Sequence, residues 1–219
     1  MTLASPPPAS PSAPAPLELE SQPLRLPRDL RLTPEQFERV CRANPEAVLE
    51  LRADGHLLVM TPTGGETSAR NLRLGQRLLL WADGAGAGRW RVFDSSGGFR
   101  LPDGSVLSPD AALVHQERWQ ALTPEQRRGF PPLCPDLVIE LASPSDEGPR
   151  GVPALRRKMD LYQVNGAHLG WLLLPEERAV EIWRSGQPGM AERLVNASRL
   201  EAGEEFAGLA LELEEIWVV

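Results

Sequence analysis

Short apolar runs separated by turn-forming residues alternate along the chain with segments whose apolar side chains recur at helical spacing. Runs of strand length that are rich in Val, Ile and Leu predict strands, and apolar positions three or four residues apart predict helices. The expected strands are 48–51, 56–60, 90–94, 99–101, 106–114, 137–141, 169–174, 180–183 and 192–195. The expected helices begin at Thr33, after the turn 61–67, at Thr123 and near Pro153, and an amphipathic end, 209–219, should pack on the core.

The composition favours one domain behind a tail. A chain of 219 residues with 42% hydrophobic content can bury one good core. Residues 1–29 are rich in Pro, Ala and Ser, which predicts a disordered tail, and residues 30–219 are expected to form a single domain. The tail lacks the pattern of a secretory signal and no apolar stretch is long enough to span a bilayer, so we expect a soluble, cytoplasmic protein without a membrane partner.

Charge and cysteine usage narrow the classes of site. The two cysteines are far apart and the three histidines are scattered, which argues against a zinc site or a disulfide framework. A net charge of -7 argues against a broad basic surface for nucleic acid. Any such binding must therefore rest on a local patch.

Two polar residues stand out around the predicted strand 137–141. Glu140 interrupts this buried strand, where a carboxylate needs a partner or a metal ion. Lys158, on the helix that follows, is the only lysine in a chain with 22 arginines. A lysine is a compact charge whose pKa responds to burial, which suits a reaction centre. Chance survival in an arginine-rich chain explains its position equally well.

A second carboxylate, Asp110, lies within the expected strand 106–114. Two carboxylates on neighbouring strands and an ammonium on the next helix favour divalent-metal chemistry on a phosphate. Asp110 and Glu140 would hold Mg²⁺, with Mn²⁺ as the alternative, and Lys158 would orient a water or neutralise developing charge. Asp110 could instead cap a turn, and Asp136 is expected to do so.

Two further acids, Glu50 and Glu66, are candidates for a metal-side or water-orienting carboxylate. Surface or capping roles explain both equally well, since Glu66 sits where an acid favours a helix N-terminus. Arg70, Arg73 and Arg77 fall on one face of the helix that ends near residue 82. Such a row is usually a solvated face, but it is the best local candidate for DNA phosphate contacts.

These motifs, taken in order, resemble the Uma-type restriction endonuclease family of the PD-(D/E)xK nuclease superfamily. The resemblance rests on Ser108-Pro109-Asp110, on PDLVIELASPSD at 135–146, on Lys158-Met159 with Tyr162, and on GWLLLP at 170–175; it extends from about residue 30 to the end. It implies an α/β fold with a restriction-endonuclease-like core, a mixed sheet flanked by helices, to which an N-terminal helix and a β-hairpin are added. It also implies that Asp110 and Glu140 are the metal-binding acids.

The chain departs from the superfamily pattern at one position. Ala142 stands two residues after Glu140, where a lysine is usual, and the resemblance implies that Lys158 takes its place. The implied activity is metal-dependent hydrolysis of DNA, and a homodimer would provide two symmetric sites for cutting both strands. Two alternatives stay open: an inactive nuclease-fold module that binds DNA or protein, and a hydrolase of another phosphodiester.

Overall fold

The computed structural model describes residues 27, 29–144, 151–187 and 189–218. The described strands are β1 (Val48–Leu51), β2 (Leu57–Met60), β3 (Trp90–Asp94), β4 (Phe99–Arg100), β5 (Val106–Leu107), β6 (Ala111–His115), β7 (Leu137–Leu141), β8 (Leu169–Leu174), β9 (Ala179–Arg184), β10 (Glu192–Val195), β11 (Arg199–Glu201) and β12 (Ala210–Glu212). The described α-helices are α1 (Pro34–Ala43), α2 (Gly65–Asp83), α3 (Gln116–Gln120), α4 (Pro124–Arg128), α5 (Val152–Val164) and α6 (Glu214–Trp217). Helices and strands therefore occur where the apolar spacing predicts them, except in the segment 106–114 described below, and α3, β11 and β12 are additional elements that were not predicted.

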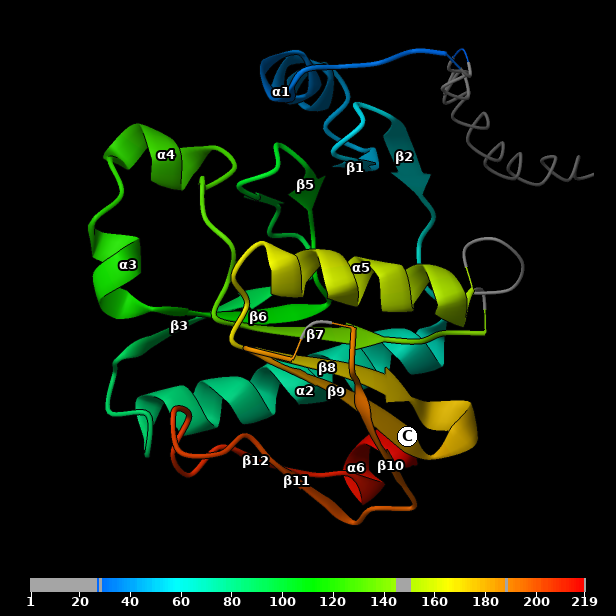
Figure 1. Cartoon of the computed structure of the whole chain (residues 1–219), viewed down its shortest axis with the longest axis vertical. Helices are drawn as coiled ribbons and strands as arrows, with labels where there is room; N and C mark the ends of the chain where they lie inside the picture. Colours follow the sequence, from blue (N-terminus) through cyan, green and yellow to red (C-terminus); the bar gives the residue numbers. More distant parts are fainter. Residues whose placement is uncertain (1–26, 28, 145–150, 188, 219) are drawn as a thin grey trace, which may run out of the picture.

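A six-stranded mixed sheet with the order β10-β9-β8-β7-β6-β3 forms the centre of the molecule. Strands β7 and β8 are parallel, and α5 makes the crossover between them. Helix α5 covers one face of this sheet and α2 the other, as Figure 1 shows. The predicted mixed sheet flanked by helices is confirmed.

The two faces of the sheet carry separate cores because side chains alternate along each strand. On β6, Ala111 and Leu113 pack with the α2 side, whereas Ala112 and Val114 pack with the α5 side. The predicted C-terminal packing is also confirmed, since Trp217 of α6 belongs to the core on the α2 side.

A smaller sheet, with the order β2-β1-β5-β4, lies beyond α5 in Figure 1. Helix α1 begins with a capping box at Thr33, and its Phe37 packs on Leu51 and Val106 of this sheet. Strands β1 and β2 form the expected hairpin around Asp54-Gly55. These parts are the predicted N-terminal additions to the core.

The prediction of one continuous strand over 106–114 is wrong. The segment divides into β5, which belongs to the smaller sheet, and β6, which belongs to the larger one. Pro109 explains the break, because a proline donates no ladder hydrogen bond and restricts the backbone before it. Asp110 is thereby placed at the entry to β6, where the chain crosses from one sheet to the other.

The predicted tail falls mostly outside the described residues, and so do Ser145 and Asp146 of the PDLVIELASPSD motif. The single domain over 30–219 stays a prediction. Within the described ranges, no helix is both long and apolar enough to cross a membrane.

Candidate active site

Lys158 lies at the centre of a polar cluster between the two sheets. Its Nζ is 2.8 Å from Glu50 Oε1 and 2.9 Å from Glu140 Oε1, and it donates to the carbonyl oxygen of Ser108 at 2.9 Å. These partners come from β1, from β7 and from the link between β5 and β6. Four segments far apart in sequence therefore meet at one ammonium group.

Local structure explains how each carboxylate reaches this point. Glu140 follows Val138 by two residues on β7, so both side chains face α5, where Lys158 lies. Glu50 is held by the backbone, because its Oε1 accepts the N–H of Ser108 at 2.9 Å. Ser108 thus binds Glu50 through its N–H and Lys158 through its carbonyl, which fixes the pair.

The cluster is buried, and burial sets its electrostatics. The side chains of Glu140 and Glu50 are only 4% and 5% exposed. Burial raises the pKa of Glu140 to about 8 despite the opposing charge of Lys158, and Asp110 and Glu50 raise it further. Burial disfavours the charge on Lys158, but the neighbouring carboxylates of Glu140 and Glu50 outweigh it and raise the pKa of Lys158. Lys158 is therefore a fixed cation and a hydrogen-bond donor, and Glu140 is the group poised to exchange a proton.

Asp110 adjoins the cluster and is held on both oxygens. Its Oδ2 accepts the backbone N–H of Leu141 at 2.8 Å, and its Oδ1 accepts from Asn71 Nδ2 at 3.0 Å. The first bond places Asp110 beside Glu140, which precedes Leu141 on β7. The second ties Asp110 to α2, on the other side of the sheet. The structure thus brings Asp110, Glu140, Lys158 and Glu50 together.

Asn71 and Tyr162 join this group without having been predicted as site residues. Asn71 Oδ1 is buried and has no hydrogen-bond partner within the described residues. The Tyr162 ring lies beneath Lys158, whose Nζ is 5.9 Å from the ring centroid. Burial and the charges of Glu140 and Glu50 raise the pKa of Tyr162, so its phenol stays neutral. No signal in the sequence separates Asn71 from an ordinary helix-surface amide.

Glu66 and Asp136 lie outside the described contacts of Lys158. Glu66 is exposed and pairs with Arg70 at 3.4 Å, and none of the described contacts around Lys158 involves it. Asp136 accepts the backbone N–H of His115 at 2.7 Å and binds the guanidinium of Arg118. These bonds hold the excursion between β6 and β7 against the sheet, which agrees with a structural role for Asp136.

The arginine row of α2 is solvated only in part. Arg70 is 6% exposed and donates through Nε to the carbonyl of Ile216 at 3.0 Å. Arg77 binds Glu215 with a bidentate fork, and Arg73 lies 3.9 Å from the same carboxylate. The row therefore docks α6, because a helix C-terminus and an acid offer it acceptors. The predicted solvated row is wrong for Arg70, and phosphate contact stays a proposal only for Arg73 and Arg77.

Comparison with known protein families shows which family the chain belongs to. A model of the family described as "Uma2: Putative restriction endonuclease" matches residues 34–214. The chain belongs to the Uma2 family. The match spans every element from α1 to the start of α6 and includes all four residues of the Lys158 cluster.

A solved structure supports the same fold. The crystal structure of a "putative nuclease belonging to DUF820" from Anabaena variabilis superposes with a TM-score of 0.66 at 20% identity, covering 85% of this chain and 97% of that one. The predicted restriction-endonuclease-like fold is therefore confirmed. No curated protein matches the chain.

The donor atoms of the cluster fit the divalent metal that nucleases of this fold generally use. Asp110 and Glu140 offer carboxylate oxygens, which Mg²⁺ prefers, and repulsion between them is one cause of the raised pKa of Glu140. Three acidic side chains, Asp110, Glu140 and Glu50, gather around one ammonium, and a divalent cation would balance the charge that Glu140 gains when it loses its proton. Among the described residues, no three His, Cys, Asp or Glu side chains are arranged to hold a metal. Two carboxylates, with water and substrate oxygens, are therefore the donor set to consider.

Proposed function

We propose that the chain is a metal-dependent DNA endonuclease that hydrolyses phosphodiester bonds with a metal-activated water. The observation that carries the proposal is the position of Lys158, held by Glu50 and Glu140 next to Asp110. Burying an ammonium among acids adds little to folding stability, because the desolvation cost offsets the attraction between the charges. The same fixed positive charge is well suited to stabilise negative charge on a phosphate.

Each residue has a distinct role in this proposal. Asp110 and Glu140 would hold Mg²⁺ or Mn²⁺, and the metal would supply a bound water of lowered pKa and positive charge for the phosphate. Lys158 would turn the N–H that now faces Glu140 to the attacking water or to a phosphate oxygen, while Glu50 and the Ser108 carbonyl keep the ammonium in place. Glu66 has no role here, since its observed partner is Arg70. Arg73 and Arg77 could contact DNA only where Glu215 releases them.

Cleavage of supercoiled plasmid, linear duplex and branched DNA with Mg²⁺ or Mn²⁺ tests the proposal. We expect cleavage by the wild type, none in EDTA, and a loss of roughly 100-fold or more for Lys158→Ala and Asp110→Asn. Arg157→Ala is the matched control, because Arg157 is the exposed neighbour of Lys158 on α5. Wild-type protein that leaves every DNA substrate uncut with both metals would contradict the proposal.

The same assay separates the two alternatives. A hydrolase of another phosphodiester would turn over RNA or small cyclic and linear nucleotides in preference to DNA. An inactive module would bind without turnover, and Lys158→Ala would leave its binding unchanged. A homodimer, proposed because duplex cleavage needs a site for each strand, would be seen as twice the chain mass in solution.

A further inference from the structure

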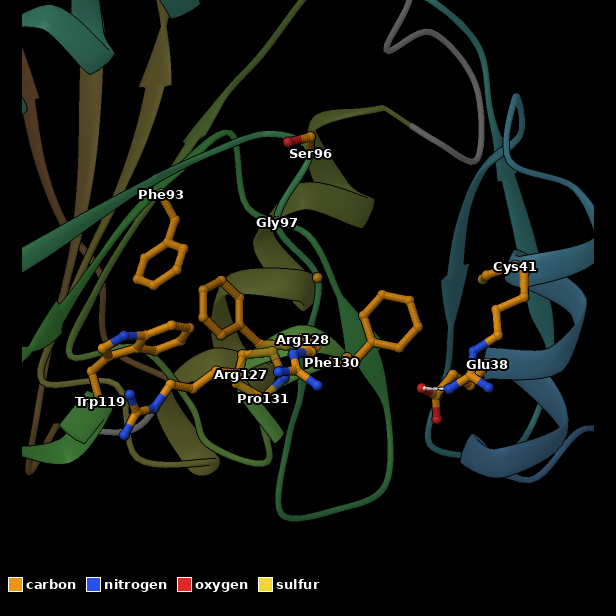
Figure 2. A pocket seen from close by; sticks show the side chains of 14 residues that line it. Glu38, Cys41, Phe93, Ser96, Gly97, Trp119, Arg127, Arg128, Phe130 and Pro131 are labelled. Atoms are coloured by element: carbon orange, nitrogen blue, oxygen red, sulfur yellow. Dashed lines mark hydrogen bonds and ion pairs between the residues drawn. The ribbon is translucent and has the colours of Figure 1, made fainter. Parts of the chain in front are cut away.

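A cavity of about 420 Å³ opens between α1, the turn from β3 to β4, and the segment that carries α3 and α4. Its volume lies in the range of roughly 300–1,000 Å³ that is typical of small-ligand sites. The lining combines the half-buried rings of Phe93, Trp119 and Phe130 and the buried ring of Phe99 with three arginines, Arg42, Arg127 and Arg128, and one acid, Glu38. Figure 2 shows Phe93 and Trp119 together on one side and Phe130 toward α1.

The rings of Phe93, Trp119 and Phe130 are half-buried, so their faces border the cavity. Phe93 and Trp119 lie 5.1 Å apart between centroids, and Phe130 is held by Phe37 at 5.4 Å. Rings fixed in this way by their neighbours lose little entropy when a flat group stacks on them. Nucleic-acid bases are such groups, and stacking on aromatic side chains tolerates any base sequence.

The cavity is also a local positive patch on an acidic protein. Arg127 donates Nε and one terminal nitrogen to the carbonyls of Leu122 and Gln120, which fixes its guanidinium at the rim. Arg128 is exposed and has no hydrogen bond or ion pair from its side chain within the described residues. Arg91, which lies outside the cavity lining, places its guanidinium 5.3 Å from the centroid of the Trp119 ring. Arg42 of the lining is bound to Glu38, but Arg127 and Arg128, unlike Arg77 of α2, have guanidinium groups that are not bound to carboxylates of the described residues.

Gly98 connects the cavity to the Lys158 cluster. A Cβ at Gly98, which lines the cavity, would meet the Phe130 ring at 2.8 Å and Ser108 Oγ at 3.3 Å, so Gly98 packs against both residues. Ser108 is the residue whose N–H binds Glu50 and whose carbonyl binds Lys158. A ligand in the cavity therefore lies next to the backbone that holds the candidate active site.

We propose that this cavity binds an unpaired nucleobase of the DNA substrate, stacked on Trp119 with its phosphate at Arg128, and so selects DNA with an unstacked nucleotide beside the scissile bond. The inference rests on the proposed function, because it gives that site its substrate class. Bases inside a duplex are stacked on each other and cannot enter, whereas single strands, loops and frayed ends present free faces.

Binding is measured by fluorescence anisotropy in EDTA, so that no cleavage is needed. The probes are a labelled single strand, a blunt duplex of the same sequence and a free deoxynucleoside monophosphate as competitor. We expect the wild type to bind the single strand more tightly than the duplex. Trp119→Leu should weaken single-strand binding about tenfold with little effect on the duplex. For Arg128→Gln, the slope of the logarithm of the single-strand binding constant against the logarithm of the salt concentration should become shallower by about 0.7.

Arg39→Gln is the control, since Arg39 is exposed on α1, lies outside the cavity lining and has no described side-chain partner. Cooperative unfolding is checked for each variant, and if Trp119→Leu does not fold, Arg128→Gln decides alone. Equal affinity for both DNA forms, unchanged binding by both variants, or binding of the mononucleotide but not of the strand would overturn the inference. If both cavity variants bind DNA as the wild type does and DNA is cleaved, only the cavity inference is refuted. If the wild type prefers the single strand but cleaves no DNA, only the proposed nuclease activity is refuted.

Discussion

Lys158 Nζ lies 2.8 Å from Glu50 Oε1, and this contact joins the two sheets of the molecule. Glu50 belongs to β1 of the smaller sheet, whereas Lys158 lies on the helix that covers the larger one. The N-terminal addition is therefore part of the candidate active site, because it holds the ammonium that faces Glu140.

Removing the ammonium should destabilise the fold. In Lys158→Met the carboxylates of Glu50 and Glu140 stay buried without their cation, which should cost about 3 kcal/mol. Urea unfolding at neutral pH measures the loss. Adding Glu140→Gln to this variant should cost less than the sum of the two single changes, because both changes act on the same contact between Lys158 and Glu140. Additive losses, or a loss below about 0.5 kcal/mol for Lys158→Met, would show that the pair is not coupled.

The raised pKa of Glu140 predicts a pH dependence of stability. Glu140 titrates near 8 when folded, against about 4.3 when unfolded, so the folded chain holds the extra proton between these values. Stability should therefore fall as the pH rises across this window, by up to about 1.4 kcal/mol per pH unit. The loss is complete above the folded pKa.

Glu140→Gln removes this titration, so its stability should depend less steeply on pH than that of the wild type. Denaturant unfolding of both proteins in EDTA, from about pH 5 to pH 8, makes the comparison. Parallel pH profiles would mean that Glu140 is ionised throughout the window in the folded chain.

Asn71 should act on the site through Asp110. Asn71→Ala removes the donor to Asp110 Oδ1, and loss of such a supporting bond typically costs roughly 10- to 100-fold in metal affinity or activity. DNA cleavage and Mg²⁺ titration are the measurements. Gln76→Ala, an exposed change on the same helix, is the control and should behave as the wild type. An unchanged metal affinity in Asn71→Ala would leave Asn71 with a structural role.

Arg70 and Arg73 are neighbours on one helix face, but substituting them should have different effects on stability. Arg70→Met leaves the carbonyl of Ile216 without its buried donor and should cost about 2 kcal/mol of stability. Arg73→Met should cost less than about 0.5 kcal/mol, because its ion pair is long and its side chain is 45% exposed. Thermal unfolding compares them. Equal losses would contradict the docking of α6 by Arg70.

The sequence predicts the strands well where apolar runs are bounded by turns. Strands β7 and β8 have the predicted bounds, because burial and flanking turn residues specify both ends locally. The segment around Pro109 failed because its apolar pattern is continuous across the break. Only the tertiary fold assigns Val106 and Ala111 to different sheets.

The candidate site was predictable to the extent that its residues violate local rules. A carboxylate in a buried strand and a single lysine mark Glu140 and Lys158, and Glu50 was named without a preference between roles. Asn71 breaks no such rule, so only its contact with Asp110 reveals it. Arg70 was misjudged because its acceptor, the carbonyl of Ile216, lies more than a hundred residues later in the chain.

The most direct test of the account is calorimetric titration of Mg²⁺ and Mn²⁺ into the wild type, Asp110→Asn and Glu140→Gln, each shown first to be folded. If the two acids form one metal site, the wild type binds the cation and either substitution abolishes the heat of binding. A wild type that binds neither metal, even with DNA present, would contradict the account, and so would binding that survives both substitutions.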